Sequence, residues 1–123
     1  MIDNGLICGE LDTVDHCLLI CAGVRECGDG VRNVISRMLG CRVSEKQLLC
    51  LSLNCRNKSK LKLCLWFWIK STYKIFEYKV RNLKVLWRKM LEEIGTAVGM
   101  QLDIGTIENI NQLNGLINAD LTR

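Results

Sequence analysis

Ten apolar residues between positions 66 and 97 follow one another at alternating steps of three and four residues, and this spacing constrains the fold more than any other feature. They are Trp66, Ile69, Tyr73, Phe76, Val80, Leu83, Trp87, Met90, Ile94 and Ala97. Such steps place side chains on one face of an α-helix, as at the a and d positions of a heptad repeat. The pattern predicts one long helix over about residues 66–94. We expect its stripe to be buried, within a helical bundle or against a partner helix.

Helical spacing of apolar residues recurs elsewhere in the chain. It covers residues 14–24, 31–39, 45–55 and 104–121. We expect the first of these segments to end in a turn at Cys27–Gly30. A capping box at Ser44 and Gln47 precedes the third. Leu61, Leu63 and Leu65 alternate with lysines, so a short strand is the alternative before residue 66. The chain contains no proline. The sequence therefore predicts an all-α fold, a small bundle of four to six helices.

We expect residues 1–123 to form a single helical domain. Its predicted parts are cysteine-rich helices over residues 1–55, a basic loop over 56–65, the long basic-aromatic helix over 66–97 and a C-terminal amphipathic helix over 100–123. The most apolar run, Leu63 to Ile69, lies between two lysines and is far shorter than the roughly 20 residues that a membrane-spanning helix needs. No integral membrane span is predicted.

Positive charge and aromatic rings are concentrated in residues 56–89, which hold 11 of the 17 Lys and Arg residues, one acidic residue and all seven aromatic residues. Basic side chains bind phosphates and aromatic rings stack on unpaired bases, so RNA binding is one open hypothesis. Its candidate residues are Lys58, Lys60, Lys74, Arg81, Arg88 and Lys89. A basic amphipathic helix with tryptophans is also typical of peripheral membrane binding or of a calmodulin-type target.

All eight cysteines lie within the first 64 residues. The acidic start of the chain does not resemble a secretory signal, so we expect a reducing intracellular compartment, cytoplasmic or nuclear, in which disulfides are rare. No C-x2-C pair, the usual spacing of structural zinc sites, is present. We therefore expect reduced, mostly buried cysteines and no metal or other cofactor. The alternative is a metal held by His16, Cys17, Cys21 and Cys27.

The residues offer little support for catalysis. His16 is the only histidine, and the adjacent Cys17 would project about 100° away from it on a helix. The sequence contains no G-x-S-x-G, Walker A or G-x-G-x-x-G motif. We therefore predict a non-enzymatic interaction or assembly component that docks a protein partner, or a second copy of itself, through the long helix. The predicted docking residues are Trp66, Ile69, Tyr73, Phe76, Val80, Leu83, Trp87 and Met90.

Overall fold

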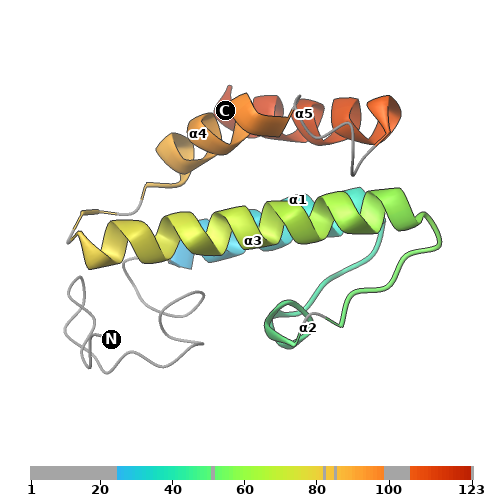
Figure 1. The fold of residues 1–123 in the computed structure, drawn as a ribbon, viewed down its shortest axis with the longest axis horizontal. Helices are drawn as coiled ribbons and strands as arrows, with labels where there is room; N and C mark the ends of the chain where they lie inside the picture. The colour runs from blue at the N-terminus through green and yellow to red at the C-terminus, as the bar shows by residue number, and fades with distance from the viewer. Residues whose placement is uncertain (1–24, 51, 82, 85, 99–105, 123) are drawn as a thin grey trace.

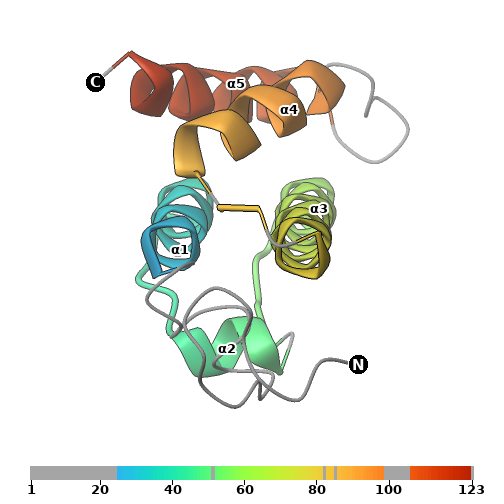
Figure 2. The ribbon, with the colours of Figure 1, turned by 90° about the vertical axis from the view of Figure 1, so that its left-hand side faces the viewer.

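The computed structural model describes residues 25–122 except 51, 82, 85 and 99–105, and the described residues form five α-helices and no strand. The helices are α1 (Arg25–Leu39), α2 (Glu45–Leu49), α3 (Lys58–Val80), α4 (Trp87–Val98) and α5 (Ile107–Leu121). α1 and α3 lie side by side, α4 and α5 cover them on one side, and α2 lies on the other side (Figures 1 and 2). The predicted all-α bundle of four to six helices is confirmed.

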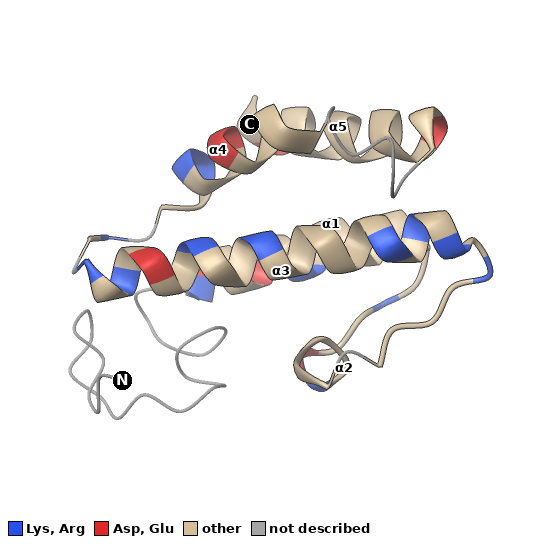
Figure 3. Cartoon of the chain, in the orientation of Figure 1, with Lys and Arg blue, Asp and Glu red and all other residues tan. Residues whose placement is uncertain are grey.

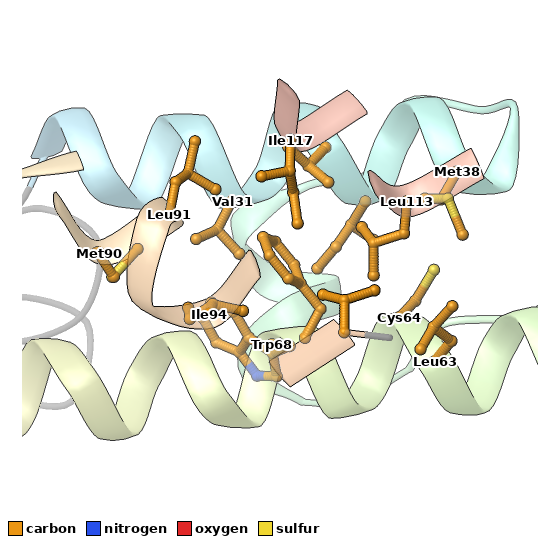
Figure 4. Packing of buried hydrophobic residues seen from close by; sticks show 14 of the residues in the cluster. Val31, Met38, Leu63, Cys64, Trp68, Met90, Leu91, Ile94, Leu113 and Ile117 are labelled. Carbon is orange, nitrogen blue, oxygen red and sulfur yellow. The ribbon is translucent and has the colours of Figure 1, made fainter. Parts of the chain in front are cut away.

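The core lies between the α1–α3 pair and the α4–α5 pair (Figure 4). Val31 of α1, Trp68 of α3, Ile94 of α4 and Ile117 of α5 all contribute to it, and each is at most 4% exposed. Burying a side chain of this size stabilises the folded state by about 1.5–3 kcal/mol. Apolar burial between the layers therefore holds the four longer helices together. None of the described helices is both long enough and apolar enough to cross a membrane.

α1 continues without interruption through residues 27–30, so the turn predicted there is absent. Gly28 and Gly30 are both buried in this helix. A Cβ atom at Gly30 would lie 2.5 Å from Cε2 of Trp87, so only glycine allows the indole ring to pack this closely on α1. A glycine costs about 1 kcal/mol relative to alanine inside a helix. Packing between α1 and α4 offsets that cost. This packing is a contact between distant segments, so local sequence preferences do not indicate it. The predicted helix over residues 14–24 lies outside the described residues.

Side-chain caps fix where α2 and α3 begin. The predicted capping box is present, because Ser44 Oγ accepts a hydrogen bond from the Gln47 N–H and Gln47 Oε1 accepts one from the Ser44 N–H. α2 nevertheless ends at Leu49 and does not continue to residue 55. Asn57 Oδ1 accepts a hydrogen bond from the Lys60 N–H at 3.0 Å and so caps α3. Residues 58–65 therefore belong to α3 and form neither the predicted basic loop nor the alternative strand.

The long helix predicted over residues 66–94 is divided into two helices. α3 ends at Val80, and α4 begins at Trp87 after a reversal of the chain. The reversal places α4 on α5, with further contacts to α3 and α1. It buries Met90, Leu91, Ile94 and Val98 of α4. A straight continuation of α3 would leave these side chains beyond the end of the bundle. Tertiary burial therefore explains the break.

α5 corresponds to the predicted C-terminal helix. Thr106 caps it, since its Oγ1 accepts a hydrogen bond from the Asn109 N–H at 3.2 Å. Ile110, Leu113 and Ile117 of the predicted apolar series are buried, whereas Ile107 is exposed. Residues 100–105 lie outside the described part of the chain.

Candidate docking surface

α3 carries apolar side chains on two opposite faces. One face is buried and includes Leu63, Phe67 and Ile75, each 0% exposed. The other face carries four side chains that we call the α3 stripe, with exposed fractions of 56%, 65%, 48% and 49%: Ile69, Tyr73, Phe76 and Val80. At about 100° per residue the stripe occupies a sector of roughly 60°, centred roughly 180° from the buried face. The α3 stripe therefore makes no contribution to the core.

The structure separates the eight predicted docking residues into two groups. Ile69, Tyr73, Phe76 and Val80 lie together on the exposed face of α3, and Leu83, 44% exposed, follows in the connection to α4. Trp66 is half-buried against the core cluster. Trp87 is half-buried in α4, and Met90 is fully buried there. From Ile69 to Leu83 the series is therefore not buried within the bundle of one chain, because α3 turns a different set of apolar side chains toward α1, α4 and α5. Burial of these residues against a partner stays a prediction.

The α3 stripe borders open space in the described structure. In Figure 2 no labelled helix lies beside the flank of α3 that faces away from α1. A shallow hollow on this surface is lined by Tyr73, Phe76, Glu77, Val80 and Arg81. Large apolar side chains have areas of about 150–250 Å², so these exposed fractions leave on the order of 400 Å² of apolar surface. Contiguous exposed patches of about this size on soluble proteins often mark binding sites.

A polar cluster at the edge of the buried face of α3 joins this helix to α4. Tyr78 Oη donates a hydrogen bond to Glu93 Oε2 at 2.6 Å, and Lys74 Nζ lies 3.3 Å from the same oxygen. The hydrogen bond from Tyr78, together with Lys74, lowers the pKa of Glu93. Burial of Tyr78, and then its bond to Glu93, raises the pKa of the phenol. The cluster links α3 to α4 across 15 residues of sequence. No local pattern in the sequence indicates this cluster, because Tyr78 and Glu93 are 15 residues apart.

Glu93 should make stability depend on pH in the acid range. Its pKa is lowered in the folded state, so its contribution is present above the unfolded carboxyl pKa of about 4.3 and is lost as pH falls through the folded value. We expect Glu93→Gln to reduce the free energy of unfolding at pH 7 by about 1 kcal/mol, allowing for the partial exposure of Glu93, and by much less at pH 3. Urea titrations at both pH values measure this. Glu92→Gln, at the exposed neighbouring position, is the matched control, and equal effects of the two substitutions would contradict the assignment.

The candidate RNA-binding residues do not form one continuous row. Figure 3 shows the positions of basic residues distributed along the α3 ribbon, with others at the start of α4. Within α3, Lys74 is paired with Glu93, and Arg81 lies 3.7 Å from Glu77 just after the helix ends. The remaining candidates are at the two helix starts: Lys58 and Lys60 in α3, and Arg88 and Lys89 in α4. Because the chain reverses after Val80, Lys74, Arg81 and Arg88 do not share one helix face.

The described cysteines are all free thiols and occupy two kinds of environment. Cys27 and Cys64 are buried in the core, and burial raises the pKa of each thiol to about 12. Cys41 and Cys50 are exposed, and Cys55 is half-buried. The expectation of mostly buried thiols is therefore wrong for these three, because they lie outside the packed helices. Of the alternative metal ligands, Cys27 is a core residue, and His16, Cys17 and Cys21 lie outside the described residues. No group of three or more potential metal ligands is found in the described part of the chain.

The chain matches no known protein family, and comparison with curated proteins and with solved structures found no similar protein.

Proposed function

We propose that this protein is a non-enzymatic interaction or assembly component that docks a protein partner through the α3 stripe. The observation that carries the proposal is the position of the stripe opposite the buried face of α3. Its four large apolar residues do not stabilise the core, yet they keep regular helical spacing over three turns. An amphipathic helical surface of this kind binds an apolar helix or groove through residues at i, i+4 and i+7. Ile69, Tyr73 and Phe76 have this spacing.

Single-stranded RNA is the second candidate partner, because two exposed aromatic rings lie near basic side chains. Tyr73 and Phe76 are accessible for stacking, and Arg81 is close to both on the same surface. Two features favour a protein instead. The two aromatic rings are flanked on the stripe by the aliphatic Ile69 and Val80, which offer no stacking surface. Glu77 also places negative charge beside the rings.

The proposal is tested by capture of interacting protein from the native source with the tagged full-length chain. We expect the wild type to retain a specific protein, which includes an untagged copy of itself, and the double variant Tyr73→Glu/Phe76→Glu to lose at least about 90% of it, since each introduced charge would have to be desolvated on docking. The control is Asn111→Glu/Gln112→Glu, which adds the same charge at two exposed positions of α5. Equal retention by all three proteins would refute docking through the stripe.

Salt dependence separates the two candidates. Binding to phosphates weakens steeply as salt rises, whereas apolar docking changes little. We expect retention of the protein partner to be similar at 0.1 M and 0.5 M salt. Tight, salt-sensitive binding of a generic single-stranded RNA that is abolished by Lys74→Glu/Arg81→Glu/Arg88→Glu would instead favour the RNA hypothesis.

A further inference from the structure

We infer that the α3 stripe binds the α3 stripe of a second copy of this chain, with the two helices antiparallel about a two-fold axis. The inference rests on the proposed docking function and adds the identity of the partner. It is carried by the order of side chains along the stripe and by the charges on one of its flanks.

The stripe reads the same in both directions by chemical type. From its start to its end the order is aliphatic, aromatic, aromatic, aliphatic, at Ile69, Tyr73, Phe76 and Val80. Its midpoint lies between residues 74 and 75, so an antiparallel pair centred there places Tyr73 opposite Phe76 of the second copy. The same alignment places Ile69 opposite Val80 of the second copy. Aromatic therefore meets aromatic and aliphatic meets aliphatic in all four layers, which is a favourable arrangement for offset ring packing.

The charged flank of the stripe is self-complementary in the same alignment. Lys70 follows Ile69 and Glu77 follows Phe76, so both lie on one flank, and a two-fold axis brings that flank against itself. Lys70 then lies near Glu77 of the second copy, offset by about 3 Å along the axis at about 1.5 Å per residue. Two such ion pairs form by symmetry. Arg81, 3.7 Å from Glu77 in the same chain, adds positive charge to each pair.

A parallel pair lacks this complementarity. Side by side in the same direction, Glu77 would face Thr72, and Lys70 would face Leu65, so neither charge would meet an opposite one. The other flank contributes no exposed charge next to the stripe, because Lys79 is only 2% exposed. Charge pattern therefore selects the antiparallel orientation.

The position and size of the stripe fit a modest dimer. Because the stripe lies opposite the core, α1, α4 and α5 of each copy are on the far sides of the paired helices. With on the order of 400 Å² of apolar surface from each copy and the flanking residues, the pair would bury on the order of 1,000 Å², at the lower end of specific interfaces. Interfaces at this end of the range are mostly those of weak, transient complexes, so association must be measured up to several hundred micromolar.

Sedimentation equilibrium of the full chain, with reductant to prevent disulfides through Cys41 and Cys50, tests the inference. We expect the mean mass to rise from the 14.0 kDa of one chain toward twice that value as concentration increases. Tyr73→Glu/Phe76→Glu should remain monomeric, and the α5 control Asn111→Glu/Gln112→Glu should dimerise like the wild type. A wild type that stays monomeric at several hundred micromolar would refute the inference. This is the result expected if residues 1–24 of the same chain, and not a second copy, covered the stripe.

Charge reversal tests the orientation. Lys70→Glu alone and Glu77→Lys alone place like charges opposite each other, so each variant should self-associate on the order of tenfold more weakly than the wild type. A mixture of the two variants restores both opposite-charge pairs and should associate about as well as the wild type. A mixture no stronger than the separate variants would refute the antiparallel pair. A monomeric wild type that still captures another protein through the stripe would refute the second copy as partner and leave the docking function standing.

Discussion

Phe67→Ala is expected to lower the free energy of unfolding by about 3–5 kcal/mol, because it opens a cavity in the core. Phe67 is 0% exposed on the buried face of α3. The same substitution at Phe76, which is 48% exposed on the opposite face of the same helix, should cost less than about 1 kcal/mol. Residue type, helix and chemical change are identical in the two variants, so the difference reports only which face of α3 meets the core.

Urea unfolding followed by circular dichroism at a few micromolar protein measures both values, since low concentration keeps association from adding to apparent stability. If Phe67→Ala does not fold, the milder pair Phe67→Leu and Phe76→Leu gives the same comparison with smaller differences. A loss at Phe76 equal to that at Phe67 would contradict the assignment of the α3 stripe to the surface. Phe76→Ala is also expected to weaken dimerisation while leaving the fold intact, which separates docking from stability.

Helical state was predictable from the sequence, but the orientation of α3 was not. Phe67, Trp68 and Ile75 have helical spacing as regular as that of Ile69 and Tyr73, so apolar periodicity identifies two faces of α3 without ranking them. The choice depends on which face of α3 the helices α1, α4 and α5 cover. Contacts between segments that are distant in sequence therefore determine which face of α3 is exposed as the candidate docking surface.

The same distinction between local and distant interactions explains the other differences. The capping box of Ser44 and Gln47 depends on only four consecutive residues, and its prediction is confirmed. Residues 81–86 contain no glycine or proline, so Asn82, which is less common than glycine after a helix, was the one local signal for the end of α3. Gly28 and Gly30 are typical turn residues, yet they lie inside α1, where the Trp87 ring packs against Gly30. Each error arose where packing overrode local preference.

We expect the exposed thiols of the described cysteines to be alkylated much faster than the buried ones. Thiolate is the reactive form, and burial raises the pKa of Cys27 and Cys64 from the ordinary value of 9.0 to about 12. At pH 8 this lowers their thiolate fraction by about a thousandfold. Because a thiolate of higher pKa is also more nucleophilic, we expect iodoacetamide to label the exposed Cys41 and Cys50 at least about thirtyfold faster than Cys27 and Cys64. Mass spectrometry of peptides after timed labelling measures the rates.

Labelling in guanidinium chloride is the control, because unfolding exposes every thiol and should bring the four rates together. Comparable rates in the folded protein would show that Cys27 and Cys64 are not in the core. The two Phe variants extend the test. Cys64 lies on the same buried face of α3 as Phe67, so Phe67→Ala should increase its labelling through more frequent opening of the core, while Phe76→Ala should leave it unchanged. Faster labelling of Cys64 in both variants would mean that Phe76 also supports the core.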